Sequence, residues 1–100
     1  MSAYVALLLV DLHFPQAGSL KAKRKELSSL KGQLQQRLNC AVAEVDHQDT
    51  WQRAQLSVAL TSGSLKQLDR ETATVERFII DRFPDTASIQ HFVTSVEDIG

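Results

Sequence analysis

Cysteine is almost missing from this chain of 100 residues, because Cys40 is the only one. A disulfide within the chain and a zinc site built from several cysteines are therefore excluded. The apolar residues around Cys40 predict that its thiol is buried as a small hydrophobic group. A chain without disulfides suits reducing surroundings.

Long apolar runs are also missing. The N-terminal candidate, residues 3–10, is too short to cross a membrane and ends at Asp11. No basic segment precedes it, so the layout of a signal peptide is lacking. These features predict a cytoplasmic protein with no membrane partner.

Neither sign of charge is in excess, since 11 basic residues face 12 acidic ones and the formal net charge is −1. The molecule as a whole is therefore not a general binder of polyanions, and any affinity for nucleic acid must come from a local patch. The length and a hydrophobic content of 43% predict a single domain over residues 1–100 with one modest core.

The first half of the chain predicts a strand and a long helix. Residues 4–13 are dense in Val and Leu on both alternating faces, which is typical of a strand that is covered at least partly on both sides. Ser19 is a good N-cap, and Asn39 is a plausible end of the helix. One helical stripe is made of leucines at positions 20, 27, 30, 34 and 38.

The second half predicts three strands and a second helix. Ser64 and Gln67 form a capping-box signature, and Pro84 stops the helix that follows. The predicted strands cover residues 40–46, 52–61 and 87–96, and a short tail covers residues 97–100. The resulting order, βαββαβ, indicates an α+β, ferredoxin-like sandwich: a four-stranded antiparallel sheet with two helices on one face.

The ferredoxin-like strand order, 4-1-3-2, has a consequence for function. It places the ends of the first two strands, the start of the third and the start of the first helix at one edge of the sheet. The polar turn between the second and third strands carries the richest chemistry of the chain at that edge. The side chains expected there are Asp11, His13, Glu44, Asp46, His47, Gln48, Asp49, Trp51 and Arg53.

The first helix begins with a concentration of positive charge at Lys21, Lys23, Arg24 and Lys25. Lys23 lies about 40° from the centre of the leucine stripe and should reach toward the polar turn. Positive charge in the first turns opposes the helix dipole, so something should compensate it. Two explanations remain open: salt bridges to acids of the edge (Asp11, Asp46 or Asp49), or a bound anion such as a phosphate.

Two motifs of the chain, LHFPQAGSLKAKRKEL and VAEVDHQDTWQRAQL, resemble the YlxP-like family of small bacterial proteins, a domain of unknown function. The resemblance covers nearly the whole chain and supports the ferredoxin-like fold. It implies no established activity. Genes of the family often lie beside genes for translation initiation and ribosome maturation, so the resemblance implies an association with RNA or the ribosome.

The preferred hypothesis is a binding protein without catalytic residues, metal or cofactor, which contacts RNA or the ribosome through the basic helix and the polar turn. RNA binding on the sheet face is disfavoured, because Tyr4 and Phe92 are the only aromatics within the predicted strands. Trp51 is expected to cap the core more readily than to stack on a base.

Two alternatives stay open. One is a small metal-binding protein or enzyme that uses His13, Asp46, His47 and Asp49, although no known metal-site spacing such as HExxH occurs. The other is a dimeric protein-interaction module. The apolar residues of the first strand leave Leu and Val on the sheet face without helices, where a second copy could cover them in a homodimer.

Overall fold

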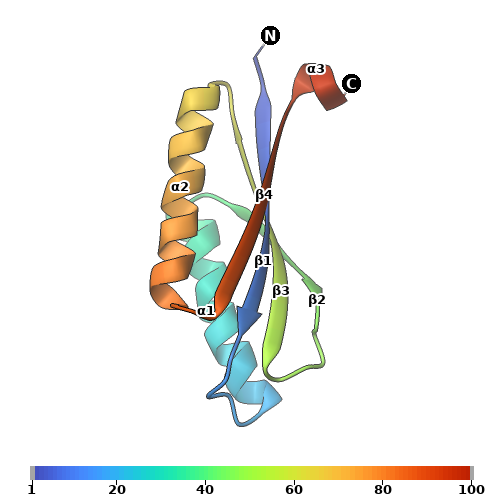
Figure 1. Ribbon diagram of the computed structural model, residues 1–100, viewed down its shortest axis with the longest axis vertical. Coiled ribbons are helices and arrows are strands. Elements are labelled where there is room, and N and C mark those ends of the chain that lie inside the picture. Colours follow the sequence, from blue (N-terminus) through green and yellow to red (C-terminus); the bar gives the residue numbers. More distant parts are fainter. Residues whose placement is uncertain (1, 100) are drawn as a thin grey trace.

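The computed structural model describes residues 2–99 and confirms the ferredoxin-like arrangement (Figure 1). Four antiparallel strands form one sheet in the order β2-β3-β1-β4. The elements are β1 (Tyr4–His13), α1 (Leu20–Arg37), β2 (Ala41–Asp46), β3 (Arg53–Ser62), α2 (Leu65–Arg82), β4 (Ala87–Ser95) and α3 (Val96–Ile99). The short helix α3 occupies most of the segment that was predicted as a tail.

Both long helices begin at the predicted caps. The Ser19 hydroxyl accepts a hydrogen bond from the backbone N–H of Ala22 at 3.1 Å, and the Ser64 hydroxyl accepts one from Gln67 at 3.2 Å. The capping box at α2 is only half formed, because the Gln67 amide donates to Glu71 Oε1 at 2.9 Å instead of returning to the cap. Asn39, just beyond α1, has a left-handed φ of 55°, which asparagine tolerates at a helix end.

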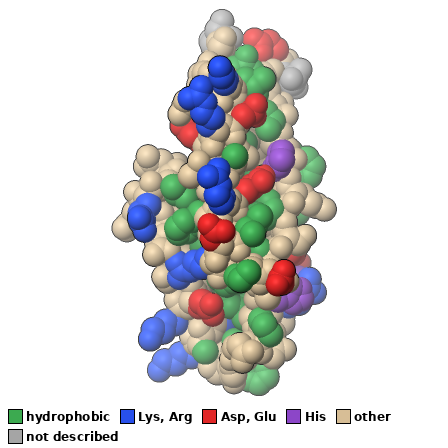
Figure 2. All heavy atoms as spheres, turned by 60° about the vertical axis from the view of Figure 1, so that its left-hand side comes forward, with side chains coloured by type: hydrophobic (Ala, Val, Ile, Leu, Met, Phe, Trp, Pro, Cys, Tyr) green, Lys and Arg blue, Asp and Glu red, His purple; other side chains and the backbone are tan. Residues whose placement is uncertain are grey.

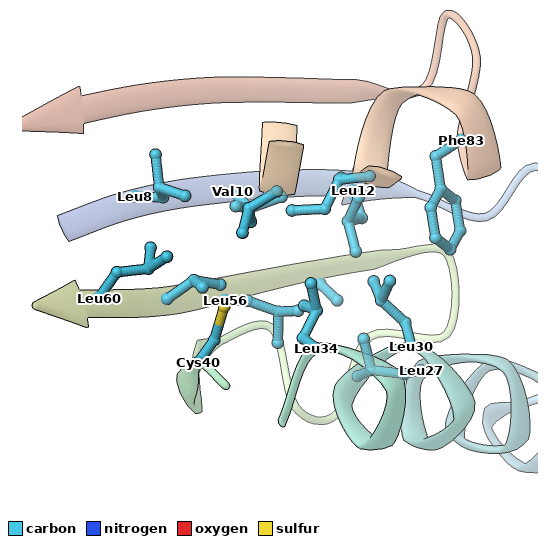
Figure 3. Packing of buried hydrophobic residues seen from close by; sticks show 14 of the residues in the cluster. Leu8, Val10, Leu12, Leu27, Leu30, Leu34, Cys40, Leu56, Leu60 and Phe83 are labelled. Carbon is cyan, nitrogen blue, oxygen red and sulfur yellow. The ribbon is translucent and has the colours of Figure 1, made fainter. Parts of the chain in front are cut away.

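The core lies between the sheet and the two helices (Figure 3). Leu8, Val10 and Leu12 of β1 point to the helix side, and Leu30 and Leu34 of α1 are fully buried against the sheet. Each such side chain contributes about 1.5–3 kcal/mol by leaving water. At one end of this layer the rings of Phe14 and Phe83 meet edge to face, with centroids 5.5 Å apart.

The two long helices are offset along the molecule, which measures 49 × 24 × 22 Å. The first half of α2 extends past the C-terminal end of α1 (Figure 1). Near the other end of α2, the Arg82 guanidinium donates to Ser29 Oγ at 2.8 Å and to the Gln33 side chain, both on α1. These bonds join the helices only where they overlap.

The face of the sheet without helices has an apolar middle. Leu7 of β1 lies directly opposite Phe92 of β4 on one side and Ala59 of β3 on the other. Ala59 in turn lies opposite Ala41 of β2. Leu7 and Phe92 are 41% and 57% exposed, so the largest side chains of this row are in contact with solvent.

Within the part of the chain that the structure describes, no helix is both long enough and apolar enough to cross a membrane.

Candidate functional site

A lysine occupies the first core position of α1. The buried side chains of this helix lie at positions 23, 27, 30 and 34, and the last three are leucines. This spacing of four, three and four places all of them on one face of a helix. Lys23 therefore begins the buried stripe, and its side chain is 0% exposed.

The Lys23 ammonium is held by the turn between β2 and β3. Its Nζ donates to the carbonyl oxygens of His47 at 2.7 Å and Thr50 at 2.6 Å. The Glu44 carboxylate of β2 lies 4.0 Å away. The prediction that Lys23 reaches the polar turn is confirmed, and the partners are mainly backbone oxygens.

The turn is shaped to present those two carbonyls. His47 has a left-handed φ of 64°, and its N–H donates to the side chain of the preceding residue, Asp46, at 2.7 Å. The Thr50 N–H donates to His47 O at 3.1 Å, which closes the turn. Asp and Asn side chains often stabilise such turns by forming hydrogen bonds with nearby backbone groups. Lys23 thus binds two carbonyl oxygens of one closed turn.

Burial lowers the pKa of Lys23, because the charged ammonium loses water. The negative charge of Glu44 acts against this and raises the pKa of Lys23, and that of Asp49 raises it to a smaller extent. The positive charge of Arg24 nearby lowers it. The hydrogen bonds and the carboxylates together offset the cost of placing a lysine in the core.

The acids of the edge have separate partners. Asp11 Oδ1 accepts a hydrogen bond at 3.1 Å from the amide of Gln55, its neighbour across β1 and β3. Gln55 also lies opposite Asp46. Sequence reasoning missed Gln55, although its place in the alternating pattern of β3 was a signal that it faces away from the core. Among the described residues, the carboxylate within 4.0 Å of the Lys23 ammonium is that of Glu44. The salt bridge expected with Asp11, Asp46 or Asp49 is therefore formed by Lys23 with Glu44 instead.

The other basic residues of the helix start remain in solvent. Lys21, Arg24 and Lys25 are exposed, and none makes an ion pair with a residue between 2 and 99. On the face drawn in Figure 2, Lys and Arg side chains project at the lower end of the molecule, which is the end where α1 begins in Figure 1. Arg53 is also exposed and lies opposite His13, where β1 ends and β3 begins.

Trp51 does not cap the core. It is 49% exposed and is absent from the residues packed against the buried cluster. The sequence expectation is therefore wrong. The side chain that reaches this turn from the buried face of α1 is Lys23, which donates to the carbonyl of Thr50, the residue before Trp51. Trp51 is thus an exposed residue in a turn that α1 binds through Lys23.

The structure does not gather His13, Asp46, His47 and Asp49 into a ligand set. His47 Nε2 and Asp46 Oδ2 are 3.9 Å apart. His13, however, is the last residue of β1 and lies opposite Arg53, the first residue of β3. Over the described residues, no group of three or more His, Cys, Asp or Glu side chains is placed to hold a metal ion. Gln48 donates to Glu44 O at 3.4 Å and so belongs to the framework of the turn.

Comparison with known proteins agrees with this picture of a small domain whose activity is not yet known. The model of the family described as "Protein of unknown function (DUF503)" matches residues 5–92. The uncharacterized protein YlxP of Bacillus subtilis (strain 168) is 38% identical over 81 residues, which cover 81% of this chain and 84% of that protein. A de novo designed protein, Foldit4, shares only the fold, with a TM-score of 0.60 at 9% identity over 93% of this chain and 97% of its own. The match over nearly the whole chain and the shared sequence with YlxP place this protein in the DUF503 family, the YlxP-like proteins of unknown function.

Proposed function

We propose that this protein binds RNA, in association with the ribosome, through a surface made of Lys21, Arg24, Lys25, Trp51 and Arg53. This set is called the helix–turn surface below. One observation carries the proposal: the two hydrogen bonds of Lys23 hold the Trp51 turn beside the basic start of α1. Its cations have no ion pair with any of residues 2–99, and its aromatic ring is exposed.

This combination suits single-stranded RNA. Lys and Arg side chains neutralise phosphates, which gives salt-sensitive binding with little sequence specificity. An exposed indole can stack on an unpaired base, whereas bases inside a duplex are not available for stacking. The translation context that the family resemblance implies fits such a ligand.

Lys23 acts in this proposal as a positioning residue. Its ammonium is buried and already donates to two carbonyl oxygens, so it does not contact a phosphate. The exposed carboxylates of Asp46 and Asp49 would repel an RNA backbone. The RNA backbone is therefore expected to follow the side of the turn that faces α1. His47 and Gln48 would lie at the far side of the binding site.

The direct test is sedimentation of cell extract that contains the tagged protein through a density gradient, at about 50 mM and about 200 mM salt. We expect the protein to migrate with ribosomal particles at the lower salt and to shift toward free protein at the higher salt. Nuclease treatment before loading should release it. Migration as free protein under both conditions would refute the proposal.

Replacing Trp51 with alanine is expected to weaken binding to a labelled single-stranded RNA about tenfold or more, because stacking on one base contributes about 1–3 kcal/mol. The dependence of affinity on salt should stay the same, since no phosphate contact is lost. Trp51→Phe is the matched variant and should retain most of the affinity. Fluorescence polarisation measures the affinity of each variant. Equal affinity of the alanine variant and the wild type would show that Trp51 is not part of the RNA-binding site.

A second proposal concerns assembly: we propose a homodimer through the open sheet face. It is favoured by the exposed pair of Leu7 and Phe92 in register on adjacent strands. The row runs from Phe92 on the edge strand β4 through Leu7 to Ala59 and Ala41, and a second copy could cover it with its own equivalent residues.

Phe92→Gln is expected to convert the dimer to a monomer, because it replaces the most exposed large apolar side chain of the row with an amide. Light scattering after size exclusion measures the mass directly. The control is Ile80→Gln on α2, which changes a side chain of similar exposure (48%) on another face and should leave the dimer intact. A wild-type protein that has the mass of one chain at high concentration would contradict the proposal.

A further inference from the structure

The offset of the two long helices leaves a groove beside the first half of α2. The groove has a volume of about 680 Å³ and lies between α2, the segment that joins α1 to β2, and the end of β3. In Figure 1 this is the region above the C-terminal end of α1, away from the helix–turn surface. The volume falls in the range of about 300–1,000 Å³ that is usual for sites that bind small molecules.

The groove has an apolar floor. Leu38, Leu60 and Val75 contribute to its lining from the end of α1, from β3 and from α2. Leu60 and Val75 are buried, and Leu38 is partly buried against the core. Leu60 and Val75 are already out of water, so a ring system or short chain placed here would cover mainly the accessible apolar surface of Leu38 and Ala41, which also line the groove.

Two arginines line the same groove from separate elements: Arg37 from the last turn of α1 and Arg70 from α2. Neither forms an ion pair with any residue in the described part of the chain. The acidic residue of the lining, Glu71, accepts a hydrogen bond from the Gln67 amide at 2.9 Å. The two guanidinium groups therefore remain available, and arginine is well suited to bind carboxylate or phosphate.

We infer that this groove binds a small amphipathic anion, with its apolar body against the accessible side chains of Leu38 and Ala41 and its anionic group bound by Arg37 and Arg70. The charge of the lining selects the anion, because two arginines face one glutamate. The apolar floor selects against small hydrated ions, which would gain nothing from it. The site is independent of RNA binding at the helix–turn surface.

Fluorescence titration with 1-anilinonaphthalene-8-sulfonate tests the inference, since this probe joins an apolar ring system to one anionic group. N-phenyl-1-naphthylamine has the same rings without the sulfonate and serves as the neutral comparison. We expect saturable binding of the anionic probe, with a Kd about tenfold higher in Arg37→Gln and in Arg70→Gln. The control, Arg77→Gln, removes the same charge from an exposed position of α2 outside the groove and should leave the Kd unchanged.

The place of binding is measured by amide chemical shifts, because the probe could also adsorb to exposed Phe92 on the open sheet face. Shifts at Leu38, Thr74 and their neighbours that saturate with the fluorescence support the inference. Three outcomes overturn it: shifts that centre on Phe92, equal Kd values for the anionic and neutral probes, or equal effects of Arg70→Gln and Arg77→Gln.

Discussion

Lys23→Met is expected to lower the free energy of unfolding by about 2 kcal/mol, because hydrogen bonds from a charged donor contribute about 1.5–3 kcal/mol each and the freed carbonyls regain part of this from water. Methionine keeps the apolar length of the side chain but cannot donate to His47 O and Thr50 O. Removing the buried charge also removes its desolvation cost. We expect the loss of the two hydrogen bonds to the carbonyl oxygens to outweigh this gain. Urea unfolding measures the change.

The effect should be concentrated in the turn. Amide hydrogen exchange of residues 47–53 should accelerate in the variant beyond the change in global stability, and RNA affinity should fall because Trp51 is no longer held beside α1. Lys25→Met is the matched control, since it removes the same group from an exposed position of the same helix. Equal urea midpoints for the two variants, with unchanged exchange in the turn, would show that Lys23 does not hold it.

The pH dependence gives a second measure of the same residue. Burial holds the pKa of Lys23 below its unfolded value of 10.5, so the unfolded chain binds more protons than the folded one between the two pKa values. The free energy of unfolding therefore rises with pH in that window. The stability difference between the wild type and Lys23→Met should grow as the pH is raised toward 10.5.

Simultaneous replacement of Lys21, Arg24 and Lys25 by glutamine is expected to weaken binding to a labelled single-stranded RNA about a hundredfold at low salt. Each lost phosphate contact should reduce the slope of log K against log salt by about 0.7, so three contacts reduce it by about two. Fluorescence polarisation at several salt concentrations measures both quantities. Because these side chains are exposed and form no ion pair within the described part of the chain, the fold should be unaffected.

A matched triple variant separates a local surface from a general effect of charge. Lys66, Arg70 and Arg77 of α2 are also exposed, and their replacement by glutamine removes the same three positive charges. This control should bind RNA about as well as the wild type. If both triple variants lose affinity equally, the helix–turn surface is not the binding site.

The sequence predicted the elements well because their patterns are local. The caps at Ser19 and Ser64 and the leucine stripe of α1 depend on residues within a few turns of one another. Both caps are found in the structure, and so is the middle of the stripe, Leu27, Leu30 and Leu34, whereas Lys23 and not Leu20 begins the buried face and Leu38 lies just beyond the helix. The order of the strands also followed, since βαββαβ connectivity leaves few arrangements of one antiparallel sheet. The meeting of the polar turn with the helix start was a consequence of that order.

Which side chains would be buried at this meeting point was decided by tertiary structure. Lys23 and Lys25 have the same chemistry in the sequence, but only Lys23 falls on the buried face and finds two carbonyl oxygens, which come from a turn more than 20 residues away. Backbone acceptors have no sequence signature, so the carboxylates were the visible partners. Trp51 was expected to cap the core because its ring is large and mostly apolar, yet it is 49% exposed.

The sequence by itself thus determined the fold, the edge at which the polar groups gather and the positive charge of the helix start, because periodicity and capping act over short distances. Only the tertiary structure decided that one lysine is a buried link and that its neighbours and Trp51 are left in solvent. It also decided that a groove beside α2 is lined by two arginines without an ion pair among the described residues. Those properties depend on distances between elements that are remote in the chain.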